Sequence, residues 1–166
     1  MKQVYLLIGC LCLAAFAVMP AQAFTINDLT ITLAQNGDAQ VGMHYELSFL
    51  EQSAVFLQIT NPAGELERAL EDNLQRPVRV LEADSSSAEM IIPAFATVSQ
   101  DDGAVVMTSP PLSFAKAQEA VNRYWFGPLL SPDFSPRITT IIFPDGYQTT
   151  YNNRISIPSV SHEIST

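Results

Sequence analysis

The sequence predicts an α+β domain in which two helices cover one face of an antiparallel β-sheet. Segments 29–49 and 138–151 each show two runs of alternating apolar residues around a tight turn, which is the pattern of a β-hairpin. Segments 61–76 and 113–126 carry apolar residues at helical spacing. A β-sandwich with helical excursions is the alternative architecture for the same pattern.

Residues 1–23 have the three parts of a secretory signal, which are a basic start, an apolar run and an A-x-A cleavage site. The run from Val4 to Met19 is shorter than the ~20 residues that a spanning helix needs. We expect cleavage after Ala23 and a single mature domain, residues 24–166, that is secreted or held in the cell envelope. Lipidation at Cys10 and an uncleaved, anchoring signal are the alternatives.

The composition of the mature chain narrows the range of its partners. Cys10 and Cys12 both lie in the signal, so the mature chain cannot use disulfides, thiolate metal ligands or a cysteine nucleophile. Removal of the signal leaves seven basic and seventeen acidic residues, a net charge of −10. Because phosphate contacts need clustered Lys and Arg, we expect no nucleic-acid partner. We expect membrane attachment only through an uncleaved signal, and no cofactor.

The first half of the mature chain predicts a hairpin followed by a helix. In the hairpin, Asn36-Gly37-Asp38 forms the turn, because Asn and Gly tolerate positive φ. Residues 53–60 fit either a strand or a short helix. A helix then begins with Asn61 as N-cap and Pro62 at its first position, and it ends at Arg76-Pro77.

Three strands and a second helix are expected next. The strands span 78–83, 89–98 and 104–108. Pro93 lies inside the second strand, and since proline cannot donate to a ladder, we expect this strand at a sheet edge or at a bulge. Such an edge could accept a strand from another chain. Ser113 caps the second helix, and Gly127-Pro128 follows its end.

The last hairpin contains aspartates that fit either chemistry or turn formation. Residues 138–143 are rich in β-branched side chains, and 149–151 can pair back onto them. Pro144-Asp145-Gly146 has the proline and glycine of a tight turn, so we expect Asp145 to be a turn residue. Asp133 precedes Phe134-Ser135-Pro136 in a proline-rich loop, where its side chain is expected to bond to nearby backbone.

Two histidines are the first candidates for acid-base chemistry. His44 lies in phase with the polar face of its strand and should point to solvent. Ser159, His162 and Glu163 are neighbours on a terminal tail, which we expect to be mobile. Because neighbours along a chain cannot face each other as the members of a triad do, we predict no catalytic triad there.

Acidic residues provide no convincing catalytic or metal site. The turns at 36–38 and 101–103 offer hard oxygens, but tight turns select the same residue types and neither extends into a calcium-binding loop. Glu82 follows an apolar run and is expected to lie where its strand leaves the core. We therefore predict no catalytic residue and no metal ligand.

The C-terminal part of the chain contains segments 132–136, 143–147 and 157–159, with a threonine at 139 or 140. This combination resembles a pattern in small secreted proteins of methanogenic archaea. The resemblance covers a minor part of the chain. It implies an extracytoplasmic domain and brings no site residue with it.

The sequence thus predicts a secreted or envelope-associated binding module without catalytic activity, whose partner is an envelope protein or a surface ligand. Its candidate contact is the aromatic cluster Tyr124, Trp125 and Phe126, because Trp and Tyr are favoured at interface hot spots. Packing of this cluster in the core is the plainer interpretation. An extracytoplasmic carboxylate-dependent hydrolase and a structural subunit that assembles by strand addition are the alternative functions.

Overall fold

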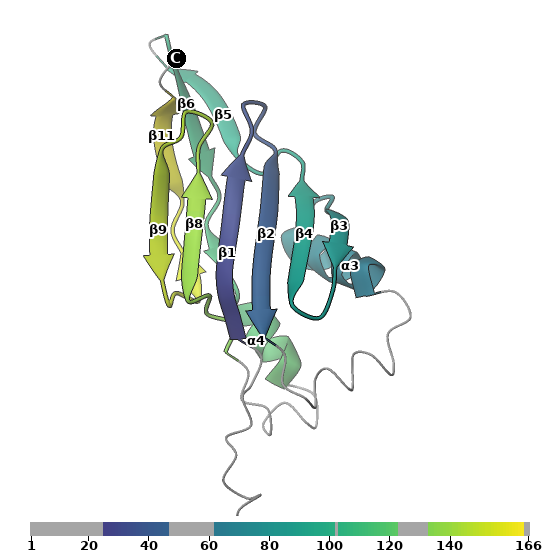
Figure 1. The fold of residues 1–166 in the computed structure, drawn as a ribbon. Coiled ribbons are helices and arrows are strands. Elements are labelled where there is room, and N and C mark those ends of the chain that lie inside the picture. The colour runs from purple at the N-terminus through teal and green to yellow at the C-terminus, as the bar shows by residue number, and fades with distance from the viewer. Residues whose placement is uncertain (1–24, 47–61, 102, 123–132, 165–166) are drawn as a thin grey trace, which may run out of the picture.

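The described part of the chain is mainly β, with one large sheet, two small ones and two helices (Figure 1). A computed structural model describes residues 25–46, 62–101, 103–122 and 133–164. In chain order the elements are β1 (Thr25–Leu33), β2 (Ala39–Glu46), α3 (Pro62–Leu74), β3 (Arg79–Ala83), β4 (Ser87–Ile92), β5 (Thr97–Asp101), β6 (Ala104–Ser109), β7 (Leu112–Ser113), α4 (Ala115–Asn122), β8 (Ile138–Ile142), β9 (Gln148–Asn152), β10 (Ser156–Ile157) and β11 (Val160–Ile164).

The large sheet has six strands in the order β3-β4-β2-β1-β8-β9. Both predicted hairpins are confirmed, as β1 with β2 and β8 with β9. They meet through a parallel pair in which Leu29 of β1 lies opposite Thr139 of β8. The prediction of a purely antiparallel sheet is therefore wrong at this pair. Parallel pairing needs a long connection, and the chain between β2 and β8 supplies one.

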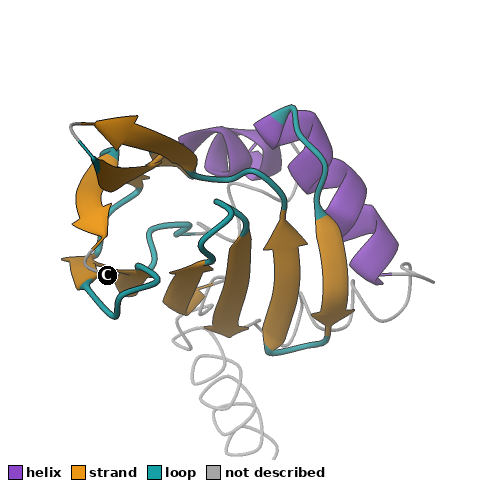
Figure 2. Ribbon diagram, turned by 90° about the horizontal axis from the view of Figure 1, so that it is seen from above, coloured by secondary structure: helices purple, strands orange, loops and turns teal. Residues whose placement is uncertain are grey.

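A second layer covers one face of the large sheet. Figure 2 shows the three-stranded sheet β11-β6-β5 on the same side of the large sheet as the helices. Helix α3 packs against β3, whereas α4 lies toward the ends of β1 and β2 (Figure 1). The prediction that two helices form the cover is thus only partly right, because a small sheet shares the role with α3.

The hydrophobic core lies between these two layers. Alternate residues of β1, β2, β4 and β8 face it, as the period of two in their burial predicts. From the second layer, Phe95, Met107 and Ile157 are at most 4% exposed. They join Ile31 and Ile141 of the large sheet in one cluster, so the sheets and the connecting segments form a single domain core.

The predicted strand 89–98 is wrong, because the chain turns at Pro93. Strand β4 ends at Ile92, and β5 begins at Thr97 in the other sheet. Ala94 has a φ of 48°, which belongs to a turn and not to a strand. Since β4 lies between β2 and β3, it is not an edge strand, and the expected edge at Pro93 is absent.

Strand β3 is an edge of the large sheet, and helix α3 covers it. The backbone N–H of Val78 donates to Glu71 Oε1 at 3.1 Å, and that of Val80 donates to Glu67 Oε2 at 3.0 Å. Carboxylates on the helix therefore satisfy amides at this edge that would otherwise pair with solvent or another chain. This contact also fixes the position of α3 beside the sheet.

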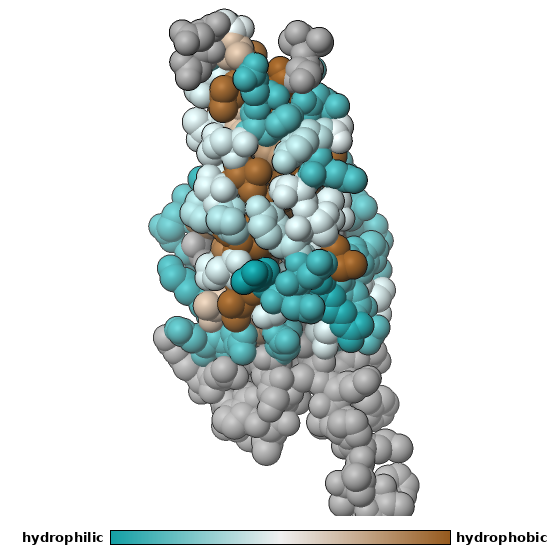
Figure 3. Space-filling model, turned by 90° about the vertical axis from the view of Figure 1, so that its left-hand side faces the viewer, coloured by the Kyte–Doolittle hydropathy of each residue, from teal (hydrophilic) through white to brown (hydrophobic). Residues whose placement is uncertain are grey.

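The C-terminal segment is a strand, and the expectation of a mobile tail is wrong. Strand β11 pairs with β6, with His162 opposite Met107. The side chains of Thr108 and Ser161 are 2.8 Å apart on the outer face of this sheet. Figure 3 shows that the side of the molecule bearing β9 and β11 is mostly hydrophilic, with scattered apolar residues. Within the described part of the chain, no helix is both long and apolar enough to cross a membrane.

Candidate functional site

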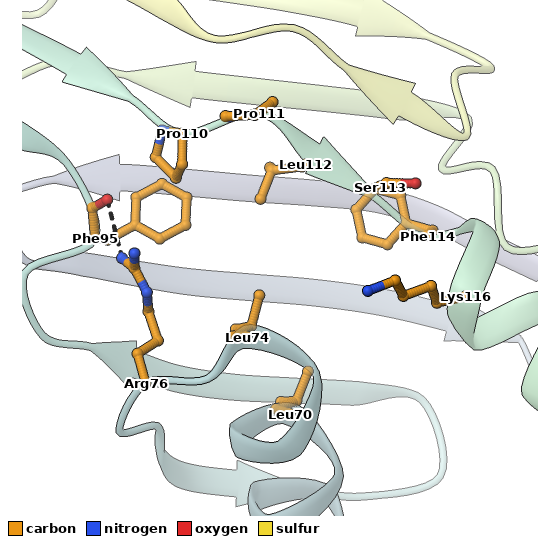
Figure 4. Close-up of a pocket in the computed structure, with 10 residues that line it drawn as sticks. All are labelled: Leu70, Leu74, Arg76, Phe95, Pro110, Pro111, Leu112, Ser113, Phe114 and Lys116. Carbon is orange, nitrogen blue, oxygen red and sulfur yellow. Dashed lines mark hydrogen bonds between the residues drawn. The ribbon is translucent and has the colours of Figure 1, made fainter.

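An apolar pocket lies beside the large sheet, between helix α3, strand β7 and the start of α4 (Figure 4). Its volume of about 360 Å³ falls in the roughly 300–1,000 Å³ range of small-molecule sites. The apolar lining consists of Leu70, Leu74, Phe95, Pro110, Pro111, Leu112 and Phe114. Ser113 and two cationic residues, Arg76 and Lys116, complete it.

Helix α3 provides one wall of the pocket. Leu66, Leu70 and Leu74 recur at four-residue spacing, and all three are partly buried against the core. The helix ends at Leu74, and Gln75 follows with a φ of 53°, the left-handed conformation typical of the residue after a helix C-terminus. The chain then turns at Arg76, whose side chain lies beside Phe95 at one end of the pocket (Figure 4).

The segment that carries Phe95 forms the opposite end and is held by the turn of the first hairpin. The Ala94 N–H donates to Asp38 Oδ1 at 2.8 Å, and the Ala96 N–H donates to the Gly37 carbonyl at 2.8 Å. Phe95 lies between these two bonds and is 4% exposed. The predicted turn Asn36-Gly37-Asp38 is confirmed as a turn, and it has the additional role of holding this wall.

The remaining wall comes from β7 and the first residues of α4. Leu112 lies opposite Ile157 in the two-stranded sheet of β7 and β10. The Phe114 N–H donates to the carbonyl of Ile155 at 2.9 Å. Because Ile157 is buried in the core, this pairing attaches Leu112 and Phe114 to the body of the domain.

The two cations differ in how they are held. Arg76 Nη1 donates to the carbonyls of Ala94 at 3.0 Å and Phe95 at 3.2 Å, so backbone oxygens and not a carboxylate hold its guanidinium. Lys116 extends from α4 across the pocket toward Leu74 (Figure 4). Among the described residues, no acidic side chain forms an ion pair with either cation. The pocket therefore combines an apolar lining with two cations, Arg76 and the solvent-exposed Lys116, that form no ion pair with a described acidic residue.

A separate cluster surrounds His162 between β11 and the β8–β9 turn. His162 Nε2 lies 2.7 Å from Asp145 Oδ2, and its ring stacks on Tyr147 with centroids 4.0 Å apart. The ring also meets Phe143 edge-on at 5.1 Å. Asp145 Oδ1 accepts the Tyr147 N–H at 3.1 Å, so the predicted turn role of Asp145 is confirmed and a second contact is added.

This cluster fastens the two sheets to each other. His162 and Asp145 have side chains only 20% and 9% exposed, respectively. The hydroxyl of Ser159 donates to the carbonyl of Ser109 at 2.6 Å and is thus engaged elsewhere. Ser159 and His162 thus have separate partners, Ser109 and Asp145. We assign the Asp145–His162 pair a structural role.

The other histidine lies on the uncovered face of the large sheet. His44 Nδ1 is 2.8 Å from Asp28 Oδ1, and their side chains are 65% and 43% exposed. The hydrogen bond and the negative charge of Asp28 raise the pKa of His44. The prediction that His44 points to solvent is confirmed. An exposed pair of this kind contributes little to stability.

The structure places the remaining candidates from the sequence as follows. Asp133 Oδ1 accepts the Ser135 N–H at 2.9 Å, which confirms its predicted bond to nearby backbone. Glu82 is exposed on β3, as expected. The cluster Tyr124, Trp125 and Phe126 lies outside the described residues, as do the segments 1–23 and 53–60. In the part of the chain that the structure describes, no three His, Asp, Glu or Cys side chains group as metal ligands.

The pocket was missed by sequence reasoning because its walls come from segments far apart in the chain. Arg76 was interpreted as part of a helix end. The excess of cations at the pocket has no local sequence signal. In comparisons with known proteins, no family model, curated protein or solved structure matches the chain.

Proposed function

We propose that the chain is a secreted or envelope-associated, non-catalytic module that binds a small apolar ligand in the pocket between α3, β7 and α4. The observation that carries the proposal is the pocket itself, a hollow of about 360 Å³ with a mainly apolar lining. Concave, largely apolar sites with a few polar groups are the usual form of small-molecule sites. The signal-like pattern of residues 1–23 supports a location outside the cytoplasm.

The walls of the pocket favour a preformed site. Phe95 is held by hydrogen bonds on both of its neighbours, and Leu112 is attached to the core through Ile157. A ligand that enters such a site does not need to order these side chains, so less of its binding energy is lost on entry. The burial of apolar ligand surface then provides the affinity, at roughly 25 cal/mol for each Å² removed from water.

Uptake of the neutral fluorescent probe phenylnaphthylamine by the purified chain tests the proposal. We expect the emission of the probe to rise and shift to the blue when the folded protein is present. When denaturant unfolds the protein, the emission should fall back to that of the probe in buffer alone. Leu70→Trp fills the pocket from α3 and should weaken probe binding at least about tenfold. Leu81→Trp is the matched control, because Leu81 is 43% exposed on β3 and does not line the pocket.

The outcome of this pair decides the proposal. If the wild-type chain does not enhance the probe, or if Leu70→Trp binds the probe as well as Leu81→Trp does, the pocket is not a binding site. Thermal unfolding of both variants shows whether each is folded. Loss of binding by a folded Leu70→Trp variant assigns the probe to the pocket.

A further inference from the structure

Strand β9 forms the edge of the large sheet on the side away from α3 (Figure 1). Among the described residues, this strand pairs with β8 alone. The side chains of Gln148, Thr150 and Asn152 on it are exposed. This edge is therefore a place at which another strand can extend the large sheet.

The backbone of β9 directs its hydrogen-bonding groups alternately toward β8 and away from it. Just before the strand, the Phe143 N–H donates to the carbonyl of Tyr147 at 2.8 Å. Because bonded and non-bonded pairs alternate along an antiparallel ladder, the odd-numbered residues of β9 bond to β8. The N–H and C=O groups of the even-numbered residues, Gln148, Thr150 and Asn152, therefore point outward from the sheet.

The two edges of the large sheet differ in how they are protected. Strand β3 carries charged residues, its register shifts between Val80 and Glu82, and carboxylates of α3 bond to amides at this edge. Charges, bulges and a covering helix all hinder pairing with another chain. Strand β9, Gln-Thr-Thr-Tyr-Asn, has no charge and no proline, and its register with β8 is continuous. An unprotected neutral edge on so acidic a chain indicates a strand partner.

We propose that β9 pairs antiparallel with β9 of a second copy of the chain, about a two-fold axis at Thr150. Thr150 then lies opposite Thr150 of the second copy, and Gln148 lies opposite Asn152. In this register every outward N–H and C=O group of the strand has a partner. Thr149 lies opposite Tyr151, and pairs of a β-branched and an aromatic side chain stabilise sheets.

The charges beyond the two ends of β9 favour a second copy as the partner. Arg154 follows the strand and is exposed, whereas Asp145 precedes it in the β8–β9 turn. Antiparallel pairing brings the arginine of each copy near the turn of the other, and parallel pairing would bring like charges together. The attraction is long-range and not a new ion pair, because Asp145 is already bonded to His162.

The two-fold pairing also limits the assembly to a dimer. It uses the β9 edge of both copies, and α3 covers the β3 edge at the other side of each large sheet. A contact of the same surface with itself closes, whereas a head-to-tail contact between different edges would continue into a fibre. The product is one continuous sheet that contains the large sheets of both copies.

A single cysteine at the two-fold axis tests the pairing. The mature chain has no cysteine, so Thr150→Cys supplies the one thiol of each copy. Opposite residues of a hydrogen-bonded antiparallel pair have Cα atoms about 5.5 Å apart, within the range of a disulfide. We expect mild oxidation to link most Thr150→Cys chains into covalent dimers. Thr32→Cys is the matched control, because Thr32 is exposed on β1 inside the sheet, and it should stay largely unlinked.

Thr150→Pro tests the contribution of the outward backbone groups. Proline removes an N–H that points away from β8, so the chain should keep its fold. In size-exclusion chromatography with light scattering at about 0.15 M salt, the wild-type mature chain should have the mass of two copies. Thr150→Pro should weaken the dimer at least about tenfold, because both bonds of the central pair are lost. Thr150→Val keeps the N–H and should remain dimeric.

The mass and the cross-linking decide the inference together. A wild-type chain with the mass of one copy at every concentration overturns it, as does an undiminished dimer of a folded Thr150→Pro variant. If circular dichroism shows that Thr150→Pro is unfolded, the cysteine variants decide, and equal linking of Thr150→Cys and Thr32→Cys refutes the pairing. Phenylnaphthylamine uptake should be the same in Thr150→Val, because β9 does not line the pocket, so the dimer and the proposed binding function are tested independently.

Discussion

Gly37 is the position at which a single methyl group should test the fold most directly. It has a φ of 86°, and a Cβ at this position would lie 2.6 Å from the carbonyl oxygen of Ala96. Gly146, in the β8–β9 turn, has the same φ of 86°, but a Cβ there would meet no atom within 4 Å. The two glycines therefore differ in the contact and not in the backbone conformation.

The pair of alanine substitutions separates two costs. Gly146→Ala should lower the free energy of unfolding by about 1–2 kcal/mol, because alanine adopts the left-handed conformation less readily than glycine does. Gly37→Ala carries the same cost and adds an overpacking cost of about 1–3 kcal/mol, because a backbone carbonyl cannot move aside as a flexible side chain can. The Ala96 N–H bond to the Gly37 carbonyl, 2.8 Å long, holds the two segments at this close distance.

Urea denaturation followed by far-ultraviolet circular dichroism measures both variants. We expect both to shift the midpoint at an unchanged m-value, with the larger shift for Gly37→Ala. Gly37→Ala should also weaken the binding of phenylnaphthylamine, because the segment that it displaces carries Phe95. If the two variants lose the same free energy of unfolding, the hairpin turn does not approach Ala96 as described, and the reasoning is wrong.

Two further predictions concern the histidines. His44 should titrate above its usual pKa of about 6.5 in NMR spectra, and Asp28→Asn should lower that midpoint; an unchanged midpoint would contradict the pairing. Because the folded chain holds this proton more tightly, the resulting stability is present below the unfolded pKa and is lost as pH rises through the folded pKa. His162→Phe should cost about 1–3 kcal/mol through the lost bond to Asp145. His162→Ala should cost about 1 kcal/mol more through the lost stack on Tyr147, and equal costs in urea denaturation would exclude a contribution from the stack.

The local parts of the fold were predictable from the sequence. Both hairpins are confirmed, because alternation on two sides of a turn depends only on neighbouring residues. The parallel pairing of β1 with β8 was not predictable. The alternation of apolar and polar residues within a strand is the same whichever strand pairs with it. The turn at Pro93 was missed for a related reason. Met90, Ile92, Phe95 and Ala96 all face the same core, although they belong to different parts of the structure.

The candidate site was less predictable than the fold. The alternation of Val160, His162 and Ile164 is a strand pattern, and their burial follows it, so the sequence did contain a signal against a mobile tail. The pairing of His162 with Asp145 depends on the contact between two sheets and has no such signal. The pocket depends on the same kind of long-range contact, because Phe95 and Phe114 come from different elements and line one hollow only in the folded chain.

The positive charge of the pocket follows from how helix α3 uses its acidic residues. Glu67 and Glu71 accept the backbone N–H groups of Val80 and Val78 at the β3 edge, which draws both carboxylates to the side of the helix that faces that strand. Arg76, just beyond the helix end, bonds to backbone carbonyls instead of to either glutamate. The contacts that protect the sheet edge thus also separate acid from base along one short segment. A strongly acidic chain can in this way keep Arg76 in an apolar pocket without an ion pair to the helix that precedes it, because two carboxylates of that helix are held by amides.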